Sequence, residues 1–244
     1  MVIGTDIDRA REELARAESI VALTGAGISA ESGVPTFRGQ DGLWRNYSAT
    51  DLATPEAFAS DPRLIWDWYQ WRRELIAKTT FNAGHSALVR LEAGVADFLL
   101  ITQNVDGLHK SAGSKALIEI HGNIWTTRCT GCGEIREDRR LDMGLPPRCR
   151  CGGLLRPDVV WFGEALDAAA MSKAQAACAR CDLMLVVGTS ALVQPAASFP
   201  LIAKQNGAKI MEVNLERTPI SSWADYSFFD KASLVLPRLV LPQP

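Results

Sequence analysis

The chain has 244 residues, 47% of them hydrophobic, and a formal net charge of −2, so it can hold one domain with an insertion or two small domains. The balanced charge argues against nucleic-acid and membrane-surface partners, and no apolar run reaches the roughly 20 residues of a membrane helix. Residues 1–6 lack the features of a signal peptide and residues 6–18 are too acidic for a mitochondrial transit peptide, so we expect a cytoplasmic protein.

The first predicted helix covers residues 7–17, and a buried strand over residues 20–23 leads into the turn Gly25-Ala26-Gly27. Two close glycines let the backbone approach a ligand, and the spacing up to Ala30 fits a loose dinucleotide fingerprint. A plain tight turn is the alternative. A dehydrogenase would continue into a second strand that ends in an acid about 20 residues after the glycines. Here residues 33–39 form a loop rich in Gly and Pro, which argues against hydride transfer.

A helix start is predicted at Thr54, which precedes a proline, and a longer helix is predicted over residues 62–78. Its main apolar stripe is predicted to be Leu64, Trp68, Trp71 and Leu75. The neighbouring stripe consists of Ile65, Tyr69, Arg72 and Ile76. A guanidinium among apolar residues needs an anion, and Tyr69 and Arg72 are three residues apart, so both can face one ligand. A structural ion pair from Arg72 to Glu56 or Asp67 is the alternative.

The middle of the chain places polar residues after two buried strands. A helix over residues 83–93 leads to a strand over residues 98–102, and a second strand covers residues 117–120. Open α/β sheets place their sites at such strand ends. His121 follows the second strand directly and is the best candidate for a general base. The other two histidines, His85 and His109, are interpreted as structural.

The cysteine pattern predicts a metal site. Without a secretion signal, Cys129-x-x-Cys132 and Cys149-x-Cys151 favour metal binding over disulfides. Four thiolates suit tetrahedral zinc and leave no open position for water, so the zinc is expected to be structural. The run of residues 136–140 is interpreted as a solvated face, and Cys178 and Cys181 as ordinary buried cysteines.

The rest of the chain returns to an α/β pattern. Residues 157–164 are predicted to form a short strand that runs into a loop, and further strands are predicted over residues 183–187, 209–213 and 226–230. A helix starting near Pro195 is predicted between the strands over residues 183–187 and 209–213. A short helix is predicted after the last strand. Strands that alternate with helices predict an α/β fold with a parallel sheet covered by helices on both faces.

Together these motifs resemble the sirtuins, the family of NAD-dependent protein lysine deacylases, over nearly the whole chain. The resemblance rests on the cysteine pairs and on Gly25-Ala26-Gly27-Ile28-Ser29, Gly33-Val34-Pro35-Thr36-Phe37-Arg38, Thr102-Gln103-Asn104-Val105-Asp106-Gly107-Leu108-His109, His121-Gly122, Phe162-Gly163-Glu164, Gly188-Thr189-Ser190 and Glu212-Val213-Asn214. It implies a Rossmann-like NAD-binding domain and a small domain, with NAD and an acyl-lysine peptide meeting between them. The Rossmann-like domain would comprise residues 1–38, 82–125 and 156–244, and the small domain the helical insertion 39–81 and the zinc module 126–155.

The resemblance also implies the roles of individual residues. Residues expected to bind NAD are Gly25, Ala26, Gly27, Ile28, Ser29, Thr36, Phe37, Arg38, Gln103, Asn104, Val105, Asp106, Gly188, Thr189, Ser190, Asn214, Lys231 and Ala232. Val105 stands where many relatives carry Ile. His121, Asn104 and Asp106 are the implied catalytic residues, and Val160, Phe162, Gly163 and Glu164 are expected to pair with the substrate backbone.

In the implied reaction NAD is consumed. The acyl oxygen attacks the ribose carbon that carried nicotinamide, and His121 acts as general base toward a ribose hydroxyl. The segment Trp66–Glu74 is similar to the class III branch, in which the Tyr69 and Arg72 positions read the distal carboxylate of succinyl-, malonyl- or glutaryl-lysine. Ala57 matches the small residue that leaves room for a longer acyl group.

Two other functions use the same motifs. Protein mono-ADP-ribosylation would share the NAD cleavage but use another acceptor, and a non-catalytic NAD-sensing module would bind NAD without releasing nicotinamide. We expect a deacylase with acyl-lysine proteins as partners, NAD and one structural zinc as cofactors, and a monomeric state.

Overall fold

The computed structural model describes residues 3–36 and 47–240. Six strands form one parallel sheet in the order β3-β2-β1-β7-β8-β9. They are β1 (Ser19–Thr24), β2 (Asp97–Thr102), β3 (Leu117–Glu119), β7 (Leu183–Val187), β8 (Lys209–Asn214) and β9 (Tyr226–Phe229). The strand order reverses between β1 and β7, which is the doubly wound arrangement of a Rossmann-like sheet. The predicted α/β fold class is confirmed.

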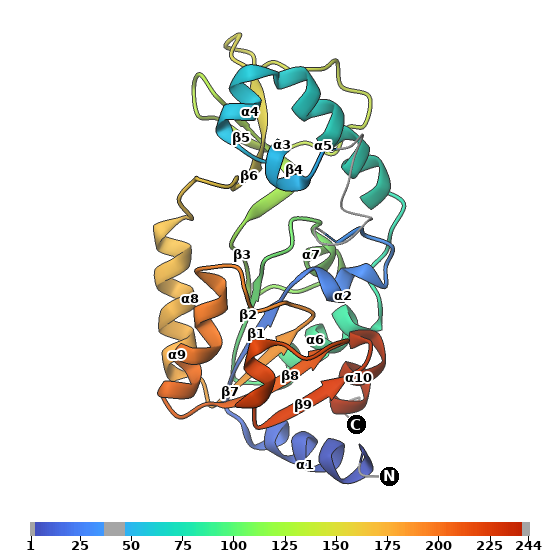
Figure 1. The fold of residues 1–244 in the computed structure, drawn as a ribbon, viewed down its shortest axis with the longest axis vertical. Helices are drawn as coiled ribbons and strands as arrows, with labels where there is room; N and C mark the ends of the chain where they lie inside the picture. Colours follow the sequence, from blue (N-terminus) through green and yellow to red (C-terminus); the bar gives the residue numbers. More distant parts are fainter. Residues whose placement is uncertain (1–2, 37–46, 241–244) are drawn as a thin grey trace.

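Helices cover both faces of this sheet (Figure 1). On one face α1 (Ile3–Arg16), α6 (Ala83–Gly94) and α10 (Ala232–Leu239) pack against alternate residues of the strands. On the other face α8 (Ala168–Arg180) and α9 (Phe199–Gln205) pack against the remaining strand residues. Because both faces are buried, β1, β2 and β7 read as nearly continuous apolar runs, and the sequence predicted them well. In the described residues between β1 and β2 the chain forms no strand, as predicted.

A second, smaller sheet lies at one end of the molecule (Figure 1). It is antiparallel, in the order β5 (Ile135–Glu137), β4 (Gly122–Cys129) and β6 (Leu155–Val159). Three helices share its hydrophobic core: α3 (Ala49–Leu52), α4 (Pro55–Ser60) and α5 (Pro62–Ile76). The predicted boundaries at residues 125/126 and 155/156 fall inside β4 and β6, so the division into domains stays a prediction.

Helix α5 begins where the sequence predicts, but it buries a different face. Thr54 caps α4 through the backbone N–H of Ala57 at 3.1 Å, and Pro62 is the first residue of α5. The predicted main stripe is wrong, because only Trp68 of its four residues is buried. The buried set is Ile65, Trp66, Trp68, Tyr69, Gln70, Arg73 and Ile76. Two hydrogen bonds set this rotation, one from the Trp66 indole to the Leu155 carbonyl (2.7 Å) and one from Arg73 Nε to the Ile124 carbonyl (2.8 Å).

The charged run 136–140 is mostly exposed or half-buried, in agreement with its interpretation as a solvated face, and only Asp138 departs from it. The Asp138 side chain is buried and forms an ion pair with Arg140 at 2.5 Å. The remaining helices of the described residues are short: α2 (Ala26–Ala30), α7 (Leu108–Ala112), and the 3-10 turns η2 (Ala196–Ser198) and η3 (Pro219–Ser222). Cys178 and Cys181 are buried, in agreement with the prediction. None of the described helices is long and apolar enough to cross a membrane.

Candidate active site

The glycine turn lies at the point where the strand order reverses. The N–H of Gly25 donates to the Val187 carbonyl at 3.0 Å, and that of Gly27 donates to the Gly188 carbonyl at 2.8 Å. A Cβ atom on Gly27 would lie 2.7 Å from the Gly188 Cα, so only glycine allows the two loops to touch. Ligands of doubly wound sheets bind at this crevice. The structure therefore joins two predicted NAD-binding motifs whose contacting residues, Gly27 and Gly188, are 161 positions apart in the sequence.

The loop after β2 packs onto the same turn. Asn104 Nδ2 donates to the Gly25 carbonyl at 3.0 Å and to Ser29 Oγ at 3.1 Å. Asp106 is buried, and burial raises the pKa of its carboxyl. Two hydrogen bonds lower this pKa again, one from the Leu108 N–H at 2.8 Å and one from the Ser29 hydroxyl. The charge of Arg72 acts in the same direction. The predicted nicotinamide pocket thus has buried polar side chains held in fixed directions.

The predicted ribose-binding residues form a second hydrogen-bonded group. Gln103 Nε2 donates to Thr189 Oγ1 at 2.9 Å, and Asn214 Nδ2 donates to the Thr189 carbonyl at 2.9 Å. Ser190 follows in the same half-buried loop after β7. Lys231 and Ala232 lie at the start of α10, after β9. The backbone N–H of the next residue, Ser233, donates to the Glu31 carboxylate at the end of α2. These elements all follow strands of one sheet and meet at its carboxyl edge.

Two predicted NAD contacts, Phe37 and Arg38, lie outside the described residues, and Thr36 is the last described residue before them. Residues 25–29 form the turn and the short helix α2. The structure therefore describes the glycine-rich end of the loop. That Phe37 and Arg38 bind NAD stays a prediction.

His121 is half-buried, and its ring is held in one tautomer. Its Nδ1 lies 3.0 Å from the Gln103 carbonyl oxygen, which can only accept, so Nδ1 carries a proton. Burial lowers the pKa of His121, and this hydrogen bond partly opposes the shift. The ring is consequently neutral near pH 7, with Nε2 available as a base. The His121 carbonyl accepts from the N–H of Val160 at 2.9 Å, so the predicted substrate segment lies beside the predicted base.

The backbone of that segment is already partly engaged. The N–H of Trp161 donates to Glu164 Oε2 at 2.8 Å, and that of Phe162 donates to the Ala53 carbonyl at 2.9 Å. With the Val160 N–H also used, three successive donors bond within the chain. The Trp161 carbonyl also accepts from the Glu164 N–H at 3.0 Å, so a peptide that pairs with this segment would have to use the carbonyl groups of Val160 and Phe162.

In the predicted acyl-reading pair on α5, Tyr69 is buried in the small core and Arg72 is half-buried. Tyr69 Oη accepts from the Trp161 indole at 2.8 Å, and burial raises the pKa of Tyr69 to about 12. Burial lowers the pKa of Arg72, while the nearby Tyr69 and Asp106 oppose that shift. Arg72 therefore lies within electrostatic reach of the predicted nicotinamide pocket. One alternative partner, Asp67, accepts from Arg63 Nε at 3.0 Å. Ala57 is half-buried and packs against the same core.

The four predicted metal ligands lie together at the end of the small sheet. The sulfur atoms of Cys129, Cys132, Cys149 and Cys151 lie within 4.8 Å of one another, with Cys129–Cys151 at 3.5 Å and Cys132–Cys149 at 3.8 Å. Zinc–sulfur bonds of about 2.3 Å in a tetrahedron require sulfur–sulfur distances of about 3.8 Å. The backbone N–H groups of Gly131 and Cys132 donate to Cys129 Sγ at 3.3 and 3.4 Å, which supports a thiolate. The four thiols fit a structural zinc ion.

Comparison with known proteins decides the family. The model of the Sir2 family matches residues 25–195, which include the glycine turn, His121 and the cysteines. The chain belongs to the Sir2 family. A relative from Aquifex aeolicus, named NAD-dependent protein deacylase, is 54% identical over 91% of this chain and 93% of its own length. A relative of the same name from Pyrococcus furiosus is 50% identical over 93% of this chain and 94% of its own length.

Solved Sir2 structures share the whole architecture. A Sir2 homologue in complex with NAD is 48% identical and has a TM-score of 0.91 over 96% of this chain and 92% of that one. A Sir2 complex with a p53 peptide and NAD is 33% identical, with a TM-score of 0.86 over 96% of both chains. The similarity therefore extends over both sheets of this Sir2 chain.

Sequence reasoning missed two residues near the site, Trp161 and Arg156. Trp161 stands between the predicted substrate contacts Val160 and Phe162, and this adjacency was the one available signal. Arg156 carries no motif, and only the structure shows that its guanidinium lies over the Trp161 ring.

Proposed function

We propose that this Sir2-family chain removes acyl groups from protein lysines with NAD as a consumed co-substrate, and that it prefers acyl groups with a distal carboxylate. The observation that carries the proposal is the convergence of His121, Asn104 and Asp106 with the Val160 segment and Arg72. Overall, NAD, acyl-lysine and water would give nicotinamide, O-acyl-ADP-ribose and free lysine. The cytoplasmic location and monomeric state remain predictions.

The chain's own residues have distinct tasks in this reaction. Nε2 of His121 would accept the proton of a ribose hydroxyl, since Nδ1 is committed to the Gln103 carbonyl. Asn104 and Asp106 would orient the nicotinamide, because burial and hydrogen bonds already fix both side chains. The turn that starts at Gly25 would let the pyrophosphate approach the backbone closely, because its glycines put no side chain in the way.

The preference for an acidic acyl group follows from Arg72 and Tyr69. A planar guanidinium and a phenol hydroxyl supply donors that an ionised carboxylate accepts, and a methyl group gains nothing from either. Arg72 is half-buried, so its field is less screened than that of an exposed arginine. Ala57 is half-buried, and its small side chain would leave room for the longer acyl chain beside the small core.

The decisive assay combines NAD with peptides that carry acetyl-, succinyl-, malonyl- or glutaryl-lysine, and follows peptide mass and nicotinamide. We expect a higher kcat/KM for the acidic acyl groups. Arg72→Met should raise the KM for succinyl-lysine and lower its kcat/KM about 10- to 100-fold, because a hydrogen bond to a charged group contributes about 1.5–3 kcal/mol.

Arg63→Met is the matched control, because Arg63 lies on the same helix in an exposed pair with Asp67. It should leave the order of the peptides unchanged. A wild-type protein that prefers acetyl-lysine and does not respond to Arg72→Met would contradict the acyl preference. Labelled ADP-ribose retained on protein in place of deacylated peptide would contradict the deacylase reaction itself.

A further inference from the structure

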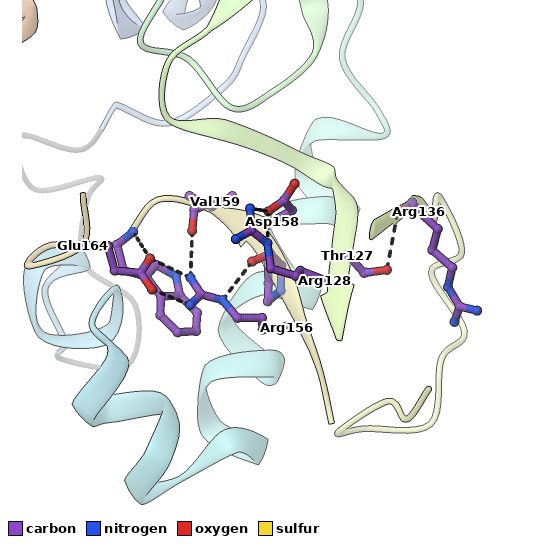
Figure 2. Close-up of polar contacts among 9 residues, drawn as sticks. Thr127, Arg128, Arg136, Arg156, Asp158, Val159 and Glu164 are labelled. Carbon is purple, nitrogen blue, oxygen red and sulfur yellow. Dashed lines mark hydrogen bonds and ion pairs between the residues drawn. The ribbon is translucent and has the colours of Figure 1, made fainter. Parts of the chain in front are cut away.

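A compact polar cluster holds the segment 156–164 at the edge of the small sheet (Figure 2). The guanidinium of Arg156 binds Glu164 through two bonds, Nη1–Oε1 at 2.5 Å and Nη2–Oε2 at 2.8 Å. Nη2 also donates to the Val159 carbonyl at 2.9 Å. Both side chains are largely buried, with 16% and 26% of their surface exposed. A bidentate pair of this kind fixes orientation as well as distance.

This pair in turn fixes the side chain of Trp161. The Arg156 Cζ lies 3.4 Å from the Trp161 ring centroid, and the Phe58 ring centroid lies 5.2 Å from it. The backbone N–H of Trp161 donates to the same Glu164 carboxylate. Only 2% of the Trp161 surface is exposed. The indole therefore has one orientation.

The fixed indole determines what the Tyr69 hydroxyl can do. The indole N–H is a donor only and lies 2.8 Å from Tyr69 Oη, so the phenol oxygen must accept there. The hydroxyl proton then has to point away from Trp161. Arg72, one helical turn further along α5, interacts with Tyr69 electrostatically, so the two groups share one region.

We propose that Trp161, clamped by the Arg156–Glu164 pair, is a positioning residue for acyl selectivity, because it commits the Tyr69 hydroxyl to act as a donor toward the acyl end. An ionised carboxylate has only acceptors, so a hydroxyl whose proton already points outward binds it without reorientation. The inference rests on the proposed preference for acidic acyl groups. It also links recognition of the acyl end to the segment beside which the peptide backbone would lie.

The test is a double-mutant cycle of Trp161→Phe and Tyr69→Phe, with succinyl- and acetyl-lysine peptides and separate kcat and KM values. Phenylalanine keeps an aromatic ring over Arg156 and removes only the N–H donor and one ring. We expect Trp161→Phe to raise the KM for succinyl-lysine about 3- to 10-fold, the size of one neutral hydrogen bond, with little change in kcat. In the Tyr69→Phe background the same substitution should have no further effect on the succinyl-to-acetyl ratio.

A purely structural role for Trp161 predicts a different pattern. Trp161→Phe would then impair both peptides equally and would add to the effect of Tyr69→Phe, which would overturn the inference. If Trp161→Phe does not fold, Arg156→Lys gives the same test, since it removes the bidentate pair but retains the charge. Arg128→Lys is its control, because Arg128 pairs with Asp158 on the same sheet (Figure 2) and should leave the ratio unchanged.

The wild-type protein separates the two possible failures. If it shows no preference for succinyl-lysine, the proposed acyl preference fails and the inference fails with it. If it prefers succinyl-lysine and Trp161→Phe retains the full ratio, only the inference fails.

Discussion

At the scale of single residues, one carbonyl group decides how His121 can act. Because the Gln103 carbonyl can only accept, it keeps the proton on Nδ1 and leaves Nε2 as the basic nitrogen. The partial burial of the ring lowers its pKa, so the neutral form dominates near pH 7. Gln103 also donates to Thr189, which ties the orientation of the base to the predicted ribose site.

Removal of this base tests its role directly. General acid–base catalysis contributes about 10²- to 10⁴-fold, so His121→Ala should lower kcat for deacylation by that factor. The Nδ1 contact is to a backbone carbonyl, hence its loss should leave the fold and the cysteine cluster intact. The measurement is nicotinamide release together with deacylated peptide, with zinc content and Tm as controls. Near-wild-type turnover in a folded, zinc-loaded variant would remove His121 from the mechanism.

At the scale of elements, the small sheet connects the metal site with the substrate segment. Strand β4 begins directly after His121 and ends at Cys129, and β6 runs from beside the cysteines to Val159. The two strands pair at both ends of this length, with Gly122 opposite Val159 and Cys129 opposite Leu155, and an irregularity in β4 shifts the register between Asn123 and Thr127. A zinc ion bound at one end would therefore stabilise the pairing that positions His121 and Val160 at the other.

Loss of the metal should consequently reduce both stability and turnover, although zinc takes no part in the chemistry. We expect Cys132→Ser to abolish binding of one zinc per chain, lower Tm, and reduce deacylation, because three thiolates leave the site incomplete. Cys178→Ser is the matched control, since its thiol is buried outside the cluster and should not change zinc content. Full activity and an unchanged Tm in zinc-free Cys132→Ser protein would refute this coupling.

The elements also show how far the sequence alone could lead. Strand β7 has the predicted bounds because its five apolar residues are buried on both faces of the sheet. Such a continuous apolar run can be identified in the sequence without knowing which strands lie beside it. The buried face of α5 was predicted wrongly because the helix buries both Trp66 and Trp68, which lie on nearly opposite sides of it. The hydrogen bonds that fix its rotation go to Leu155 and Ile124, on strands far away in the sequence. Motifs identified the predicted site residues, but the contact between Trp161 and Tyr69 depends on tertiary packing that no local pattern contains.

At the scale of the whole molecule, a buried histidine pair links the glycine turn to the core. His85 and His109 are fully or almost fully buried, with ring centroids 4.8 Å apart. His85 Nε2 lies 3.4 Å from Ser29 Oγ, and His109 Nε2 lies 2.9 Å from Thr24 Oγ1. Burial lowers the pKa of His85 to about 4 and that of His109 well below its ordinary value. Both rings are neutral in the folded protein.

The folded protein should therefore lose stability in mild acid. An unfolded histidine titrates near 6.5, so below that pH the unfolded chain binds more protons and the free energy of unfolding falls as pH falls, until His85 itself titrates near 4. Between pH 7 and 5 His85 alone should account for about 2 kcal/mol. His85→Gln is the matched variant, because glutamine at this third helical position also suits the capping box with Asn82. Denaturant unfolding at both pH values should show a shallower loss in His85→Gln, whereas equal losses would mean that His85 is not held neutral. Any release of zinc in acid is common to both proteins, so the difference between them isolates the histidine.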